Sequence, residues 1–145
     1  MNVINLLIAD HRALQTMLNK VQKTSERAVK TRQDLFLEIK QSATIHEKAE
    51  ESYFYCLLKE LKQSRPDALQ HNEEVEVMKL LLTELSATPV NSEEWTAKFS
   101  VYKDLTNHHI EEEENEIFSQ ASSLLSSKQL ELCAQQILEY KKQTK

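Results

Sequence analysis

The stretch His108–Phe118, HHIEEEENEIF, has two adjacent histidines followed by four consecutive glutamates. A run of like charges usually lies on a solvent-exposed face, because a buried carboxylate without a partner is costly. On a helix, residues four positions apart lie on the same face, about one turn apart. His109 and Glu113 therefore share one face, and His108 and Glu112 share another. One of these pairs can face a helical core while the other glutamates face solvent.

A second stretch of the chain has the same pattern. The segments HEKAEESYFYCLL, from His46, and HIEEEENEIFSQA, from His109, both have glutamates at i+4 and i+5 and an aromatic residue at i+9. A register that starts at His108 loses the aromatic match. The repeat therefore favours His109 and Glu113 as the inward pair, equivalent to His46 and Glu50, and it is typical of two halves of one bundle that supply matched side chains.

The composition excludes several classes of protein. The 145 residues include no glycine, which phosphate-cradling loops and tight hairpin turns need where the backbone is crowded. The net charge of −5 argues against a nucleic-acid partner, which would bind to a basic face. No apolar run approaches the roughly 20 residues that cross a bilayer, so we expect no membrane partner.

The N-terminal segment has no positive region and no cleavage site of a signal peptide. We therefore expect a cytoplasmic protein. Cys56 and Cys133 form no CxxC pair, and in such a chain they are expected to be reduced residues that pack in or near the core.

Apolar residues that recur at spacings of three and four predict five helices. The expected segments are 2–29, 32–63 with Thr31 as its N-cap, one from Pro66, one capped by Asn91 or Ser92, and about 127–143 with a Ser126–Gln129 capping box. Short connections predict an all-α fold. We expect an antiparallel up-down-up-down four-helix bundle over about 2–123, with a short additional C-terminal helix, in a single domain of residues 1–145.

Each of the four long helices carries a histidine on its apolar stripe. These four residues are His11, His46, His71 and His109. A single histidine on such a face is usually satisfied by a hydrogen bond, but one from each of four helices indicates a shared site. Glu50 and Glu113 follow on the same stripes, and two buried carboxylates facing one core would repel each other. Metal ions resolve this conflict, and bundle cores commonly hold them.

The donor types indicate the metal. Four imidazoles and two carboxylates exceed one ordinary site, so two ions are expected, and each glutamate could bridge them. The stripes hold no thiolate, which disfavours structural zinc, and imidazole disfavours magnesium and calcium. Mixed nitrogen and oxygen donors suit iron, with manganese or zinc as substitutes.

Four segments together resemble the hemerythrin-like, HHE cation-binding family. They are DHRALQ (10–15), HEKAEESYFY (46–55), QHNEEVEVMKLLLTEL (70–85) and EEWTAKFSVYKDLTNHHIEEEENEIF (93–118). The resemblance implies a bundle that holds an oxo- or hydroxo-bridged non-haem di-iron centre. It also implies that Glu50 and Glu113 bridge the irons, with His11 and His46 on one iron and His71 and His109 on the other.

The chain departs from oxygen-carrying hemerythrins on the third helix. Those proteins have a second histidine four residues after the first, and Val75 stands at that position here. Glu47, Glu74 or a water could fill the missing place. His108 and Glu112 are the alternative pair if the register differs, and Glu112 is also a candidate partner for a ligating imidazole.

Two tyrosines on the inward stripes are candidate hydrogen-bond donors to a bound ligand. Tyr53 is followed on its stripe by Leu57 and Leu61, and Tyr102 precedes His109 by two turns. The simpler interpretation of both is a core aromatic with a wet hydroxyl.

The expected function is that of a non-haem di-iron protein that binds or senses O2 or a related small ligand such as NO or peroxide. One alternative is a di-iron enzyme that consumes peroxide or nitric oxide. Another is a metal-free helical interaction module. The fifth helix could cover one edge of the bundle or mediate dimerisation, and the sequence does not choose between them.

Overall fold

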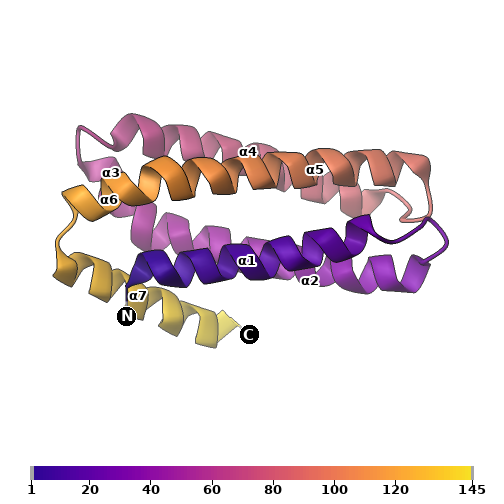
Figure 1. The fold of residues 1–145 in the computed structure, drawn as a ribbon, viewed down its shortest axis with the longest axis horizontal. Coiled ribbons are helices and arrows are strands. Elements are labelled where there is room, and N and C mark those ends of the chain that lie inside the picture. The colour runs from indigo at the N-terminus through magenta and orange to yellow at the C-terminus, as the bar shows by residue number, and fades with distance from the viewer. Residues whose placement is uncertain (1, 145) are drawn as a thin grey trace.

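The computed structural model describes residues 2–144 as a bundle of long helices joined by short connections (Figure 1). The four bundle helices are α1 (Val3–Gln22), α2 (Val29–Ala49), α4 (Arg65–Ala87) and α5 (Glu93–Glu112). α2 continues through the π-helical segment η1 (Glu50–Tyr55) into α3 (Cys56–Glu60), and α5 continues through η2 (Glu113–Ile117) into α6 (Phe118–Leu124). The last helix is α7 (Ser127–Thr144).

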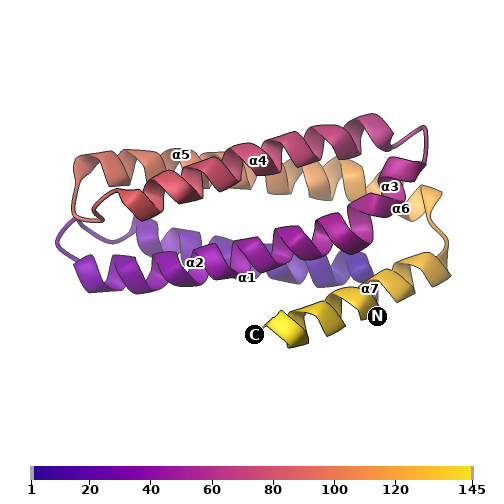
Figure 2. The same cartoon turned by 180° about the vertical axis from the view of Figure 1, so that it is seen from behind.

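Successive long helices run in opposite directions and pack side by side. α1 lies against α2, α4 lies against α5, and α1 also contacts α5 (Figures 1 and 2). Between residues 2 and 144 the structure has helices and no strand. The predicted all-α, up-down-up-down bundle with an additional C-terminal helix is therefore confirmed. The predicted domain spans 1–145, and its first and last residues lie outside the described part of the chain.

Local sequence signals placed several helix ends correctly. The Ser92 hydroxyl accepts a hydrogen bond from the Trp95 backbone N–H at 3.1 Å, so Ser92 rather than Asn91 caps α5. Pro66 lies in the first turn of α4. The Gln129 side chain accepts the Ser126 backbone N–H at 2.9 Å, and the Ser126 hydroxyl accepts the Gln129 backbone N–H at 3.1 Å, which is the predicted capping box before α7.

The boundary between the first two helices was predicted wrongly. α1 ends at Gln22 instead of about residue 29, and α2 begins at Val29, so Thr31 lies inside a helix rather than at its N-cap. The cause is the buried guanidinium of Arg32, which donates to the Thr24 hydroxyl and carbonyl and to the Val90 carbonyl. These bonds hold the connection in a non-helical path that no helical pattern in the sequence indicates.

The core consists of two apolar clusters with a polar layer between them. On α1, Leu7 belongs to one cluster and Leu14 to the other, with His11 in between. On α4, Ala68 and Val75 flank His71 in the same way. Packing at both ends of the bundle therefore fixes the positions of the histidines in its middle.

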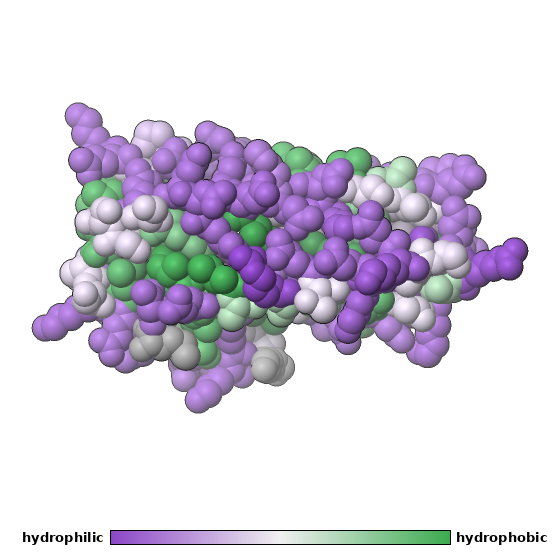
Figure 3. Space-filling model, in the orientation of Figure 1, coloured by the Kyte–Doolittle hydropathy of each residue, from purple (hydrophilic) through white to green (hydrophobic). Residues whose placement is uncertain are grey.

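α7 covers one edge of the bundle. It packs against α1, α2 and η1 and buries Cys133, Ala134 and Ile137 in the cluster that also contains Phe54. Cys133 is a buried free thiol and Cys56 is an exposed one. Hydrophilic residues cover most of the face seen in Figure 3. No helix within the described residues is long and apolar enough to cross a membrane.

Candidate metal centre

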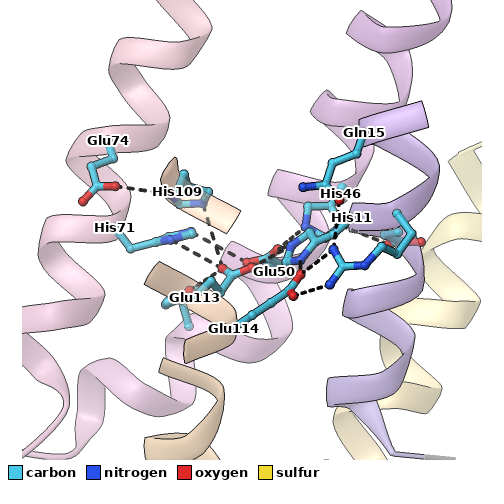
Figure 4. Close-up of polar contacts among 12 residues, drawn as sticks. His11, Gln15, His46, Glu50, His71, Glu74, His109, Glu113 and Glu114 are labelled. Atoms are coloured by element: carbon cyan, nitrogen blue, oxygen red, sulfur yellow. Dashed lines mark hydrogen bonds and ion pairs between the residues drawn. The ribbon is translucent and has the colours of Figure 1, made fainter. Parts of the chain in front are cut away.

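Six side chains converge in the polar layer at the middle of the bundle (Figure 4). They are His11 of α1, His46 of α2, His71 of α4, His109 of α5, Glu50 of η1 and Glu113 of η2. Five of them are buried, and the side chain of His46 is 13% exposed. The structure thus brings together the six residues that the helical stripes singled out.

Both glutamates stand at the first residue of a π-helical segment. A π turn uses one more residue than an α turn, and single π turns inside α-helices are frequent at functional sites. The extra residue shifts every later side chain by one position. After Glu50 the buried residues are Phe54, Tyr55 and Leu58, where the sequence stripe predicted Tyr53 and Leu57.

Four donors form the first donor group, which comprises His11, His46, Glu50 and Glu113. His11 Nε2 lies 2.8 Å from Glu113 Oε1 and 3.9 Å from Glu50 Oε1. His46 Nε2 contacts the same Glu50 oxygen. One atom from each of the four residues lies within 4.8 Å of the others, which is close enough to share an ion.

Three donors form the second donor group, which comprises His71, His109 and Glu113. Glu113 Oε2 lies 3.6 Å from His71 Nδ1 and 4.0 Å from His109 Nε2. Glu50 Oε2 lies 3.8 Å from His71 Nε2. Each glutamate thus directs one oxygen to each pair of histidines, which is the arrangement that two bridging carboxylates require.

Several buried atoms in this layer lie near other donors but make no hydrogen bond of ordinary geometry. These atoms are His11 Nε2, both carboxylate oxygens of Glu50, His71 Nδ1 and Glu113 Oε1. Buried polar groups in proteins are nearly always hydrogen-bonded, and an unpartnered buried charge is costly. Cations between these atoms would satisfy them. The buried His/Glu cluster is therefore suited to binding metal, and its two overlapping groups suit two ions.

The pKa values of the buried side chains also show that the metal-free site holds charged groups unfavourably. Burial, together with the charge of Glu50, raises the pKa of Glu113 to about 7. Burial acts on Glu50 as well, but the charge of His46 and the close contacts of its carboxylate with His46 and His11 hold its pKa well below the usual range. Burial lowers the pKa of His71 to about 3. One carboxylate and one imidazole are thus pushed towards their neutral forms, and a bound cation would favour the forms that ligate.

Three of the four imidazoles have a carboxylate on their outer nitrogen. The Nδ1 atoms of His11, His46 and His109 lie 2.7, 2.9 and 3.3 Å from oxygens of Glu114, Asp10 and Glu74. Metal-ligating histidines usually donate their second N–H to such a partner, which fixes the ring and its tautomer. His71 instead stacks on the ring of Tyr55, with a centroid distance of 3.7 Å.

The outer carboxylates are Glu114, Asp10 and Glu74, and none of them was assigned from the sequence to the outer nitrogen of a histidine. Glu74 was an alternative for the place that Val75 leaves, but it contacts the outer nitrogen of His109 rather than pointing to the centre. Asp10 was overlooked, and the expectation that Glu114 faces solvent was wrong, because its side chain is 16% exposed and contacts His11. Each adjoins a candidate ligand in the sequence, and that adjacency was the available signal.

The alternative pair lies at the surface. The His108 side chain is 65% exposed and its Nε2 lies 3.2 Å from Glu112 Oε1. The structure thus directs His109 inward and His108 outward. Glu47 lies outside both donor groups, but its Oε2 is buried without a hydrogen-bond partner, and burial raises its pKa to about 7.

Of the two candidate tyrosines, Tyr102 lies next to the site and Tyr53 does not. Tyr102 is buried in the apolar cluster next to the site, and its hydroxyl has no hydrogen-bond partner. The structure places Tyr53 away from the site, beside Tyr140 of α7, because the π turn rotates it outward. The hydroxyl of Tyr55 donates to Glu113 Oε2 at 2.5 Å instead. Its position at i+9 of the repeat was the one signal for it.

Comparisons with known proteins agree with this fold. The family model described as "Hemerythrin HHE cation binding domain" matches residues 2–121. A crystal structure of a hemerythrin HHE cation binding domain-containing protein from Mycobacterium kansasii aligns with a TM-score of 0.86 at 18% identity, over 99% of this chain and 87% of that one. At this identity the likeness shows the fold, including the edge helix α7.

A relative that is described by an activity on DNA, and not as a hemerythrin, also matches most of the chain. It is a "DNA nickase" from Nostoc sp. (strain PCC 7120 / SAG 25.82 / UTEX 2576), 24% identical over 131 residues. The match covers 90% of this chain but 36% of the nickase, so the chain spans about a third of that relative.

Proposed function

This chain belongs to the family of hemerythrin HHE cation-binding domains, and we propose that it is a non-haem di-iron protein that binds or senses O2 or a related small ligand. In this proposal the first donor group holds one iron and the second holds the other. The observation that carries the proposal is the pair of overlapping donor groups, with buried atoms that make no hydrogen bond of ordinary geometry.

The donor chemistry supports iron. Both groups combine imidazole nitrogen with carboxylate oxygen, and neither contains a thiolate. Such a mixture suits iron, with manganese or zinc as substitutes, whereas magnesium and calcium prefer sites made of oxygen alone. When bound, an iron pair would supply redox chemistry and coordination positions for a small ligand.

The protein's own groups would orient and shield the centre. Tyr55 donates to Glu113, and Phe118 stacks on His11 with a centroid distance of 5.9 Å. The outer carboxylates hold three imidazole rings in place. The two apolar clusters lie on either side of the polar layer along the bundle and shield the donors from its two ends.

A small pocket beside the second donor group supports a small, uncharged ligand. It has a volume of about 90 Å³, and its lining includes His71, His109, Glu74 and Glu112. A water molecule takes up about 30 Å³ in the liquid, so the pocket has room for a molecule of a few atoms. Its carboxylates would repel anions. Both properties favour O2, NO or hydrogen peroxide over anionic ligands.

Metal analysis with ultraviolet–visible spectroscopy tests the proposal. Protein purified with iron should contain about two irons per chain, and Glu50→Gln and His109→Ala should each lower that number. His108→Ala is the matched control, because His108 is adjacent and exposed. Fewer than about one metal per chain, unchanged in the His46→Ala and Glu50→Gln variants, would contradict it.

The second candidate is an enzyme that consumes peroxide or nitric oxide. It is favoured by Val75, which stands where oxygen-carrying hemerythrins have a histidine and leaves the second group with three donors. A catalytic metal needs such an open position. Turnover assays of the iron-loaded protein separate the two functions. A stable oxygen complex with no turnover of either substrate would reject the enzyme.

A further inference from the structure

The last turn of α7 connects to the first donor group. Lys141 forms an ion pair with Asp10 Oδ2. The same oxygen accepts a hydrogen bond from His46 Nδ1 at 2.9 Å, and His46 Nε2 contacts Glu50. A continuous series of polar contacts therefore runs from α7 through Asp10 to a candidate ligand. Residues 2–121, which the family model matches, do not include α7.

Asp10 and His46 have room to move. The Asp10 side chain is 25% exposed, and both residues line a pocket of about 290 Å³ between α1, α2 and α7. Lys141 lines the same pocket. A partly exposed carboxylate next to such a space can rotate towards water, and an imidazole that depends on it can follow. A second partner for the carboxylate opposes this rotation.

The first donor group has two such arrangements. Arg12 donates to both oxygens of Glu114, at 2.5 and 3.1 Å, and Glu114 lies 2.7 Å from His11 Nδ1. A cation thus holds the carboxylate behind each of the two imidazoles. In the second donor group, Glu74 accepts from the neutral amide of Gln70 instead. Cationic support is therefore a feature of the first group, and half of it comes from α7.

We propose that Lys141 is a positioning residue for His46, and that α7 thereby contributes to metal binding at the first donor group. Lys141 holds Asp10, and Asp10 keeps the proton of His46 on Nδ1, so that Nε2 faces Glu50 and the ion. The inference rests on the proposed function in one respect, because it requires that the first donor group binds metal.

The test compares Lys141→Met with Lys142→Met in the full chain. Methionine keeps much of the length of the lysine stem but removes the ammonium group, and Lys142 is the exposed neighbour. The affinity for Zn²⁺ is measured by competition with a chelator. Loss of a direct outer partner typically costs 10- to 100-fold in affinity, so we expect about 3- to 10-fold for Lys141→Met, at one of two zinc equivalents. Lys142→Met should match the wild type.

Two further variants show whether Lys141 acts through Asp10. Asp10→Asn should weaken zinc binding by about 10- to 100-fold. Adding Lys141→Met to it should weaken binding no further, because the two residues act in series. Lys141→Arg keeps the cation and should bind zinc nearly as tightly as the wild type. Full additivity of the two substitutions would overturn the inference.

The absorption spectrum of bound Co²⁺ separates positioning from a structural role. Positioning predicts a changed spectrum for the first cobalt equivalent in Lys141→Met and an unchanged one in Lys142→Met. A lower melting temperature of the metal-free protein, with zinc affinity and cobalt spectrum unchanged, would overturn the inference. If the wild type binds neither zinc nor cobalt, the proposed function fails first, and this outcome is distinct from equal binding by all variants.

Discussion

The two donor groups share Glu113 but differ in their surroundings. In the first, the outer nitrogen of each imidazole contacts a carboxylate that also pairs with a cation. Glu114 joins His11 to Arg12, and Asp10 joins His46 to Lys141. In the second, His71 has an aromatic ring in place of an outer carboxylate, and an acidic pocket lies beside it. The sequence repeat places matched ligands in both halves, yet the packing around them is unequal. From this difference we expect the first group to bind an ion more tightly than the second.

The largest expected effect comes from the residue that joins the groups. Glu113→Gln removes a shared carboxylate, and because loss of an outer partner alone costs 10- to 100-fold, we expect more than about 100-fold weaker binding of both metal equivalents. Isothermal titration with Zn²⁺ measures this effect. One equivalent that binds with wild-type affinity would show that Glu113 serves a single ion.

Single histidines test the difference between the groups. His71→Ala leaves the first donor group complete, so the tighter equivalent should keep its affinity within about threefold, whereas His46→Ala should weaken that equivalent by about 100-fold. Competition with chelators of graded affinity measures both. The opposite ranking would assign the tight ion to the second donor group.

The buried carboxyl of Glu47 should make the stability of the metal-free protein depend on pH. Its pKa of about 7 in the folded protein exceeds the usual 4.5, so between these values the folded state binds more protons, and its contribution to stability falls as pH rises. Glu47→Gln should therefore stabilise the metal-free protein by up to about 3 kcal/mol at pH 8 and by much less at pH 5. Chemical denaturation at the two pH values measures this change.

The same variant tests Glu47 as a donor in place of the histidine that Val75 replaces. If Glu47 supplies that donor, Glu47→Gln should weaken the second metal equivalent while it stabilises the metal-free protein. Glu51→Gln, at an exposed position of η1, is the control. Unchanged affinity for both equivalents would remove Glu47 from the ligand set.

The smallest expected effect concerns the tyrosine on Glu113. Tyr55→Phe leaves a buried carboxylate oxygen without its donor, which should cost about 1–3 kcal/mol in stability of the metal-free protein and change the spectrum of the iron-loaded one. Tyr53→Phe is the matched control and should change neither. Equal effects of the two substitutions would show that the hydroxyl of Tyr55 has no special role.

Helical periodicity accounts for most of what could be read from the chain. A spacing of four residues places His46 with Glu50, and His109 with Glu113, on single faces, whatever the rest of the fold does. The internal repeat then separated His109 from His108. Caps such as Ser126 with Gln129 are equally local, because both partners lie within one turn.

Two features escaped prediction because they depend on distant parts of the chain. The end of α1 at Gln22 follows from Arg32, whose guanidinium binds the connection and also the Val90 carbonyl, 58 residues further along the chain. The contact between His11 and Glu114 joins residues 103 positions apart. Neither pairing leaves a periodic trace in the sequence.

The sequence by itself determined the fold class, the four histidines and two glutamates of the candidate site, and the inward register of His109, because each follows from local helical geometry and the internal repeat. Only the tertiary structure decided the π turns at Glu50 and Glu113, the choice of Tyr55 over Tyr53, and the unequal support of the two donor groups. A π turn changes the phase of a helix by one residue, and the outer partners come from whichever helices pack alongside. Both depend on how separate helices meet in space, and a repeat along one chain does not encode that directly.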